Sequence, residues 1–410
     1  MPSTQEEIIM DAGIDAIGFY VPQCVLDLRD LAQARSIPYA KLAQGLGQER
    51  MAIAPPGEDI VTMGAHAAHE ALEHVDRESI DTVIVATESG VDQSKSAAIY
   101  LHRLLELPKS CKAFEIKQAC CGSTVALHLA MALVQSDPRK RVLVVASDVA
   151  RYERDSPGES TQGAGSVAFV VAPNPRLLRM DPYVGSYTDD VMDFWRPNYR
   201  ETACVDGHYS MRVYLRALGE AWTSYRQAGG PAFMDHDRFC YHLPFTQMAQ
   251  KAHHRLAVRE GYDHLSPGIQ EEKIADGLRY NREVGNTYTA SLYLSLLSML
   301  ECTTASLTGK RIGMFSYGSG CMGAFFSGVV QPGYRRYLDP AGHQGMLDGR
   351  RRLTMDEYEA LMAFVLPEDG SRVRLPTSDV SRFRFAGLDG HKRIYDACSQ
   401  QPAYAEVAAA

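Results

Sequence analysis

The chain has 410 residues, of which 45% are hydrophobic and 22% charged, a composition typical of a globular protein with a large core. A formal net charge of −8 without a basic run argues against nucleic acid or a membrane surface as the main partner, so we expect small molecules or proteins. No apolar run suits an export signal or a membrane span, and the nine cysteines form no regular framework, which together predict a cytoplasmic protein.

Strand-like and helix-like segments alternate along the chain. β-branched runs of strand length lie at 83–86, 142–146 and 167–171, and apolar segments of helical length lie at 60–72, 96–107 and 125–134. This alternation predicts an α/β sheet with helical layers. A second cycle has helical segments at 211–225 and 289–300 and a strand at 312–315, which suggests two structural repeats, residues 1–172 and 173–410.

A cysteine pair stands at the start of one predicted helix. A short extended run ending at Ile116 enters a turn that contains Cys120 and Cys121, and the apolar segment 125–134 leaves it. A thiol in the first turn of a helix feels the positive end of the helix dipole, which favours a nucleophilic thiolate. The alternative interpretation is two small core cysteines. Asn286 opens a comparable helix in the second half, so the two helix starts can face one site.

Two other residues carry potential proton-transfer chemistry. Glu88 follows an apolar strand and precedes a helix, the position at which ligands meet α/β sheets. A partly buried carboxylate there has a raised pKa and can act as a general base, although an exposed loop carboxylate fits the same pattern. His242 lies among apolar residues beside Pro244 and can move a proton near neutral pH, or it is a hydrogen-bonded structural histidine.

A glycine-rich loop at 318–323 has the GxGxxG spacing of dinucleotide-binding loops. The segment after it runs into Pro332 instead of a long helix, and Asp339 does not follow a second apolar strand, which argues against a nucleotide. A glycine loop after a strand can instead direct backbone N–H groups at a developing oxyanion.

A group of imidazoles lies on one predicted helix, where His66, His69 and His74 accompany Glu70. Spacings of three and five residues do not place all three imidazoles on one face, and no further ligand completes a metal site. We therefore expect a solvated helix face and no metal.

A thiol, a carboxylate, a histidine and an oxyanion loop are the parts needed for acyl transfer through a covalent thioester. The segments that carry them resemble the signatures of the 3-hydroxy-3-methylglutaryl-CoA synthase family in order and approximate spacing. They are 88–90, 118–120, 242–246, 285–293 and 315–320. Further similar stretches extend the resemblance over nearly the whole chain, closest to compact bacterial members. They are 45–49, 58–63, 193–197, 205–207, 386–388 and 391–393.

This resemblance implies a thiolase-like five-layered αβαβα fold built from two similar halves, in a homodimer that needs no cofactor. It implies that Cys120 takes an acetyl group from acetyl-CoA and that Glu88 removes a proton from the acetyl methyl carbon. That carbon attacks the ketone of acetoacetyl-CoA while His242 protonates or polarises the forming alkoxide. Water then releases 3-hydroxy-3-methylglutaryl-CoA, as in the mevalonate route to isoprenoids.

The resemblance also implies a set of residues around the substrates. Asn286 would help to hold the acceptor, and the backbone N–H groups of Cys120 and Ser319 would stabilise the thioester oxyanion. Further matched pocket or binding positions are Gly318, Asp148, Thr161, Asp193, Phe194 and Lys251.

Three positions depart from the family pattern. Cys121 stands where a tyrosine is common, Ala324 where bacterial relatives often have glutamate, and Gln247 where a lysine often approaches CoA phosphates, so that Lys251 alone remains. The last departure leaves open an alternative, a polyketide β-branching synthase that takes acetyl and β-ketoacyl groups from acyl carrier protein. A simpler thiolase or ketoacyl synthase would give a keto product, and a non-catalytic scaffold would not need Cys120, Glu88 and His242 together.

Overall fold

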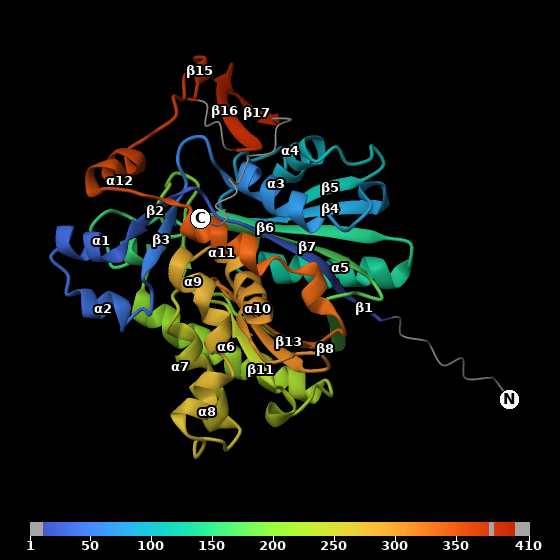
Figure 1. The fold of residues 1–410 in the computed structure, drawn as a ribbon. Coiled ribbons are helices and arrows are strands. Elements are labelled where there is room, and N and C mark those ends of the chain that lie inside the picture. Colours follow the sequence, from blue (N-terminus) through green and yellow to red (C-terminus); the bar gives the residue numbers. More distant parts are fainter. Residues whose placement is uncertain (1–10, 377–380, 398–410) are drawn as a thin grey trace, which may run out of the picture.

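A computed structural model describes residues 11–376 and 381–397. Its centre is a mixed nine-stranded sheet in the order β11-β12-β13-β8-β1-β7-β6-β4-β5 (Figure 1). The first half of the chain supplies β1 (Ala12–Tyr20), β4 (Ile80–Ala86), β5 (Lys112–Ile116), β6 (Arg141–Val149) and β7 (Ala164–Pro173). The second half supplies β8 (Leu178–Thr188), β11 (Arg238–Tyr241), β12 (Arg311–Gly318) and β13 (Met322–Val330).

The two halves repeat one strand topology. In the first half β4 is parallel to β6, and β7 runs antiparallel to both β6 and β1. In the second half β11 is parallel to β12, and β13 runs antiparallel to both β12 and β8. The orders β4-β6-β7-β1 and β11-β12-β13-β8 therefore correspond, and β5 is an additional edge strand in the first half. The predicted construction from two similar halves is confirmed, whereas the division at 172/173 stays a prediction.

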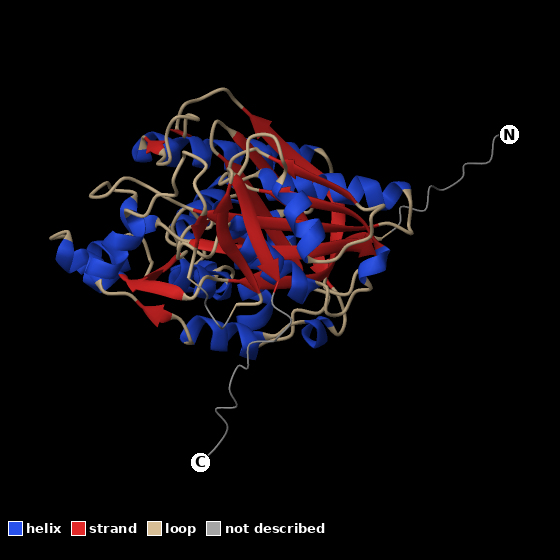
Figure 2. Ribbon diagram, turned by 90° about the horizontal axis from the view of Figure 1, so that it is seen from above, coloured by secondary structure: helices blue, strands red, loops and turns tan. Residues whose placement is uncertain are grey.

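Helices and the two half-sheets form five layers (Figures 1 and 2). One outer layer contains α3 (Ile60–Ala71) and α4 (Ala97–Leu104), and the other contains α6 (Gly207–Gln227) and α7 (Met248–Arg259). Between the sheets lie α5 (Gly122–Ser136) and α10 (Ser291–Cys302), whose side chains share one core cluster with strands of both halves. Ten consecutive residues of α10 are buried, as expected for a helix covered on every side.

The segment Ala119–Ser136, which includes α5, is long and apolar enough to cross a membrane by length and composition alone. Half of it is buried inside the protein, where it packs between the sheets as a core helix. β6 and β7 are rich in β-branched residues and almost wholly buried, because helices cover both faces of their sheet.

The remaining elements surround this core. A three-stranded sheet contains β14 (Arg351–Arg352), β2 (Cys24–Asp27) and β3 (Arg50–Ile53), and another contains β15 (Val373–Arg374), β16 (Phe383–Asp389) and β17 (Lys392–Ala397). A small ribbon contains β9 (Phe194–Trp195) and β10 (Cys204–Val205). The other α-helices are α1 (Leu28–Ala34), α2 (Tyr39–Ala43), α8 (Pro267–Glu272), α9 (Arg279–Val284), α11 (Pro340–Asp348) and α12 (Met355–Met362). The 3₁₀ helices are η1 (Arg77–Ser79), η2 (Glu159–Thr161), η3 (Phe233–Asp235), η4 (Ala275–Leu278), η5 (Tyr288–Ala290) and η6 (Tyr334–Tyr337).

The predicted solvated histidine face on α3 is wrong. His66 is almost buried and its Nε2 lies 2.9 Å from Ser381 Oγ, because β16 covers this part of the helix. Glu70 accepts a hydrogen bond from the Phe19 backbone N–H at 3.0 Å and pairs with His343. Only His74 of the three imidazoles is exposed. Packing of distant segments decided which helix face meets water.

Candidate active site

The fold places the candidate residues at the carboxyl ends of parallel strands. Glu88 follows β4, Cys120 follows β5, and Asp148 lies near the end of β6. In the second half His242 follows β11, and the glycine loop follows its parallel neighbour β12. Carboxyl ends of adjacent parallel strands meet at one edge, where α/β proteins bind ligands. Each half therefore presents its chemical groups on a corresponding edge.

The thiol of Cys120 and the carboxylate of Glu88 are in direct contact. Cys120 Sγ donates a hydrogen bond to Glu88 Oε1 at 2.6 Å, and the cysteine is 8% exposed. Burial, together with the nearby Asp148 carboxylate, raises the pKa of Glu88 to about 8, while Arg196 acts in the opposite direction. A carboxylate with a raised pKa is a stronger base than an ordinary glutamate, which suits it to remove protons from weak acids.

The expectation that the helix dipole favours a Cys120 thiolate is wrong for this structure. Burial and the Glu88 carboxylate raise the pKa of Cys120 well above its ordinary value. Cys120 also lies one residue before the N-cap of α5, which is Cys121, and not in the first helical turn. A buried thiol beside a carboxylate stays protonated, so nucleophilic attack requires transfer of its proton to a base. Glu88 is in position to accept it.

Asp148 holds the turn that carries Glu88. Its Oδ1 accepts hydrogen bonds from Thr87 Oγ1 and the Glu88 backbone N–H, both at 2.8 Å, and from the Ser89 backbone N–H at 3.0 Å and Ser89 Oγ at 2.8 Å. Its Oδ2 accepts from the backbone N–H and hydroxyl of Thr289 in η5. Asp148 thereby ties the ends of β4 and β6 to the second half of the chain, which is a positioning role.

His242 is a neutral group in a buried setting. It is 2% exposed, and burial lowers its pKa to about 3, so the imidazole carries no charge near neutral pH. Its Nδ1 lies 2.7 Å from Ser291 Oγ, and the Leu243 backbone N–H donates to the same hydroxyl at 3.1 Å. When the Ser291 hydroxyl donates to Nδ1, the imidazole proton is on Nε2 and can be donated to a substrate oxygen.

The glycine loop approaches the cysteine turn closely. A Cβ atom on Gly318 would lie 2.5 Å from the Gln118 carbonyl oxygen and 2.8 Å from Cys121 Cβ, so any larger residue would push the two segments apart. Asp193 anchors the loop, because its Oδ1 accepts from the Gly320 backbone N–H at 2.9 Å and its Oδ2 from the Tyr317 hydroxyl at 2.6 Å. The close approach of Gly318 brings the loop with Ser319 next to the turn that carries Cys120.

Cys121 belongs to this contact and not to the substrate side. It is fully buried, burial raises the pKa of its thiol to about 11, and its side chain is hydrogen-bonded to Ser316 in β12. The residue that replaces the usual tyrosine thus packs between the nucleophile turn and the glycine loop.

The surroundings of Cys120 and Glu88 contain residues that the sequence pattern identified and others that it missed. The Asn286 backbone N–H donates to the Thr161 carbonyl at 3.1 Å, and Phe194 packs on a cluster with Cys120 and Tyr288. The missed residues are Tyr152, Tyr288 and Arg196. The electrostatic influence of Glu88 and Cys120 reaches both phenols. Arg196 and Tyr288 lie inside the matched stretches 193–197 and 285–293, which was their only sequence signal, and Tyr152 lies outside every matched stretch.

Lys251 is not part of this buried group. It is exposed on α7, where its Nζ lies 3.7 Å from Met211 Sδ and 5.2 Å from the centre of the Phe245 ring. A role in binding a substrate carrier stays a prediction for this residue.

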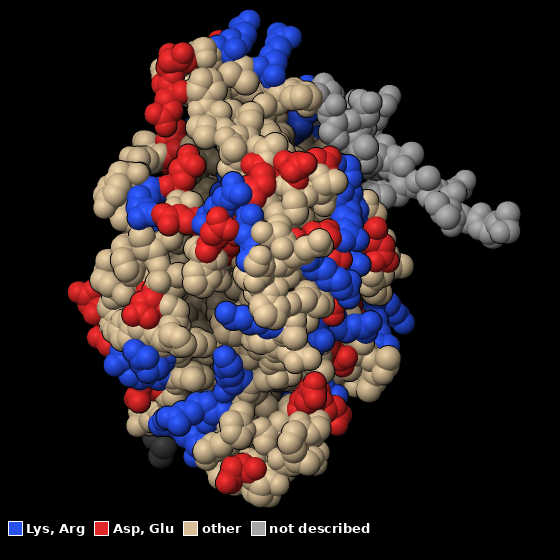
Figure 3. Space-filling model, turned by 90° about the vertical axis from the view of Figure 1, so that its left-hand side faces the viewer, with Lys and Arg blue, Asp and Glu red and all other residues tan. Residues whose placement is uncertain are grey.

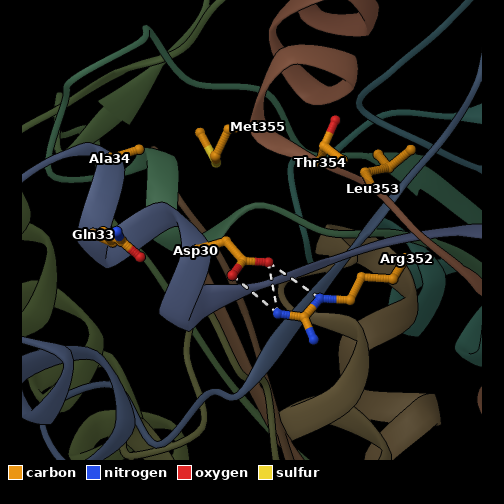
Figure 4. A pocket seen from close by; sticks show the side chains of 7 residues that line it. All are labelled: Asp30, Gln33, Ala34, Arg352, Leu353, Thr354 and Met355. Carbon is orange, nitrogen blue, oxygen red and sulfur yellow. Dashed lines mark hydrogen bonds and ion pairs between the residues drawn. The ribbon is translucent and has the colours of Figure 1, made fainter.

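A separate surface hollow lies away from the candidate residues. It has a volume of ≈ 530 Å³ between α1 and the segment 352–355 (Figure 4). Asp30 and Arg352 face each other across it with an Nη2–Oδ2 distance of 2.7 Å. This exposed ion pair satisfies both charges, so the hollow offers no free reactive group. Over residues 11–376 and 381–397, no group of three or more His, Cys, Asp or Glu side chains is arranged to hold a metal ion. The absence of a metal and a cofactor stays a prediction.

The fold and the site together define a class. A thiolase-like fold that places a buried thiol beside a carboxylate, with a histidine and a glycine loop on the matching edge, is that of acyltransferases that work through a cysteine thioester.

Comparisons with known proteins identify the family. The protein-family model described as hydroxymethylglutaryl-coenzyme A synthase N terminal matches residues 9–176. The family model for the C-terminal part of the same enzymes matches residues 179–263 and 257–365. A hydroxymethylglutaryl-CoA synthase of Enterococcus faecalis is 42% identical over 94% of this chain and 100% of its own. A polyketide biosynthesis 3-hydroxy-3-methylglutaryl-ACP synthase of Bacillus subtilis is 34% identical over 86% of this chain and 88% of its own. The chain belongs to the hydroxymethylglutaryl-CoA synthase family.

A solved structure agrees with this assignment. The crystal structure of an HMG-CoA synthase complexed with CoA matches with a TM-score of 0.90 at 38% identity, covering 95% of this chain and 100% of that one. The predicted fold class and family are confirmed.

Proposed function

We propose that this protein is a cytoplasmic hydroxymethylglutaryl-CoA synthase that condenses an acetyl group on Cys120 with acetoacetyl-CoA and hydrolyses the product to 3-hydroxy-3-methylglutaryl-CoA. The observation that carries the proposal is the 2.6 Å hydrogen bond between the Cys120 thiol and the Glu88 carboxylate, in a chain that belongs to this family. Such a product would feed the mevalonate route to isoprenoids.

The first step is transfer of acetyl to Cys120. Glu88 accepts the thiol proton, and the sulfur attacks the acetyl-CoA carbonyl carbon. The carbon–sulfur bond to CoA then breaks as Glu88 passes this proton to the leaving CoA thiolate, which returns Glu88 to its basic form. The tetrahedral oxyanion is stabilised by the backbone N–H groups of Cys120 and Ser319. The close approach of the glycine loop to the cysteine turn supports this assignment, because it brings the two N–H groups towards one another.

The second step is formation of the carbon–carbon bond. The acetyl methyl group of a thioester is a weak acid, so its deprotonation requires a positioned base with a raised pKa, which Glu88 supplies. The resulting carbanion equivalent attacks the acceptor ketone. Neutral His242 donates a proton or a hydrogen bond to the forming alkoxide, and its burial explains why it is not an imidazolium ion. Asn286 holds the acceptor.

A homodimer is part of the proposal. β5 is the last strand of the sheet, so among residues 11–376 and 381–397 no strand pairs with its outer edge. Phe114 and Ile116 on β5 are only partly buried, and Leu129 of α5, a helix in contact with β5, is 38% exposed. An unpaired edge beside an apolar helix face is best covered by the same elements of a second subunit.

A second candidate function is supported by a cationic groove. The groove has a volume of ≈ 340 Å³ between α6 and α7, and its lining residues include Arg212, Arg216, Arg255 and Arg259. Lys251 lies one helical turn before Arg255. Lys and Arg side chains are also grouped on the lower part of the face drawn in Figure 3. Such a surface suits CoA phosphates or an acidic acyl carrier protein, so the carrier-protein synthase remains the alternative.

Two experiments test these proposals. Incubation with radiolabelled acetyl-CoA should label the wild-type protein and leave C120A unlabelled; absence of Cys120-dependent label from any donor would leave only the scaffold interpretation. Acetyl and acetoacetyl groups supplied on CoA and on carrier protein in all four combinations identify the carriers. Turnover only with an acceptor bound to acyl carrier protein would favour the polyketide β-branching synthase. A keto product would indicate a simple thiolase or ketoacyl synthase.

A further inference from the structure

Arg196 lies against the candidate base without a charged partner of its own. Its Nη2 donates a hydrogen bond to the backbone carbonyl of Glu88. It follows Phe194, which packs on the Cys120 cluster, by two residues. Among the described residues Arg196 takes part in no ion pair, whereas Arg200 in the same segment pairs with Glu153. The guanidinium therefore has donors to spare beside the reaction centre.

The charges of the site make this arginine informative. The ionisable groups that face Glu88 are Asp148, Cys120, Arg196, Tyr152 and Tyr288. Of these five groups Arg196 is the cation, because the two phenols and the thiol hold their protons. His242 in the second half is neutral as well. A product that carries a new carboxylate would meet two acidic side chains and this one positive charge.

We propose that Arg196 binds the carboxylate that hydrolysis releases at Cys120, an inference that rests on the proposed synthase function. In that step water adds its oxygen to the acyl carbon and the carbon–sulfur bond breaks. One water proton goes to the Cys120 sulfur, and the other leaves the new carboxylic acid. The guanidinium pairs with the resulting carboxylate and offsets its repulsion by Glu88 and Asp148.

The decisive experiment compares 3-hydroxy-3-methylglutaryl-CoA with its methyl ester as inhibitors of Cys120 acetylation. The wild-type protein should bind the free acid more tightly, and R196Q should lose about 10- to 100-fold of that preference, the factor that a hydrogen bond to a charged group is worth. R196K keeps the charge and should retain part of the preference. R200Q, from the same segment, is the matched control and should behave as wild type.

Two outcomes of this inhibitor comparison would overturn the inference. One is a wild-type protein that binds the ester as tightly as the acid, a result that needs no variant to fold. The other is an R196Q protein that binds the ester normally and keeps the full preference for the acid.

A pH profile separates this role from a merely structural one. Exchange of the acetyl methyl protons with deuterated water requires Glu88 in its basic form. Since Arg196 favours the carboxylate form of Glu88, the midpoint of this exchange should move to higher pH in R196Q and stay in place in R200Q. A structural defect would lower the rate without moving the midpoint, which would also contradict the proposal. Failure of wild-type acetylation would instead reject the synthase function itself.

Discussion

The two halves of the molecule share a strand order but present different chemistry at corresponding strand ends. The first half carries ionisable groups in contact, where burial and the Asp148 carboxylate raise the pKa of Glu88, and burial and the Glu88 carboxylate raise the pKa of Cys120. The second half carries neutral hydrogen-bonding groups, namely His242 with Ser291, the amide of Asn286 and the glycine loop. The duplicated topology thus places a nucleophile and a base in one half and neutral hydrogen-bond donors in the other. The proposed reaction needs both sets of groups.

The largest effect should come from the nucleophile. C120A should form no acetyl-enzyme and lower turnover by at least about 10³-fold, because no other group can carry the acyl chain. Covalent labelling followed by mass spectrometry measures the first effect, and product assays measure the second. Equal loss of labelling in C121S would show that the assignment of the two cysteines is wrong.

Removal of the base Glu88 should impair the chemistry that the first half contributes. E88A should lower condensation about 10²- to 10⁴-fold, the range for loss of a positioned general base. In the wild-type protein, methyl exchange should rise with pH and level off above about 8, since Glu88 must lose its proton to act. A profile that is flat from pH 6 to pH 9 would contradict a raised pKa at Glu88.

Removal of the histidine should impair the step that depends on the second half and leave the reactions at Cys120 unchanged. H242A should lower condensation about 10²-fold while Cys120 acetylation and methyl exchange continue, because His242 acts on the acceptor. A profile with a histidine-like midpoint near pH 6.5 would contradict the lowered pKa that burial imposes. Parallel loss of acetylation in a folded protein would mean that the two halves do not divide the chemistry in this way.

A junction between the halves should affect stability and not chemistry. His343 contacts Glu70 of α3 at 2.7 Å and Glu301 of α10 at 3.0 Å. Burial alone would lower its pKa, but the two carboxylates outweigh burial and raise it to about 10. This stabilisation is fully present below about pH 6.5 and declines as the pH rises towards 10.

H343A leaves two carboxylates without their cation and should lower the free energy of unfolding by about 3–5 kcal/mol near neutral pH. Urea unfolding at pH 6, 8 and 10 checks this, and the difference from wild type should shrink at the highest pH. H74A, which removes an exposed histidine in the turn after α3, is the control and should change little.

The smallest effect should come from Cys121. C121S replaces the thiol by a smaller hydroxyl that can still hydrogen-bond to Ser316, so acetylation should persist with turnover within about 10-fold of wild type. C121Y places a large ring where Gly318 and Cys121 are already in contact and should lower turnover more. Full activity in C121Y would show that the glycine loop does not need this close approach.

The sequence by itself determined the elements and the candidate chemistry. Hydrophobic periodicity located α3, α5, α6 and α10 and the buried strands, because that pattern is a local property of the chain. Residues after strands, such as Glu88, Cys120 and His242, were recognisable because parallel strands present their carboxyl ends at a common edge.

Only the tertiary structure decided which groups touch and how their proton affinities shift. The protonated state of Cys120, the burial of His66 and the packing role of Cys121 depend on segments far away in the sequence. Arg196 gained its significance only when its segment came to lie against Glu88. Desolvation and charge proximity are three-dimensional quantities, and a linear pattern of residues does not contain them.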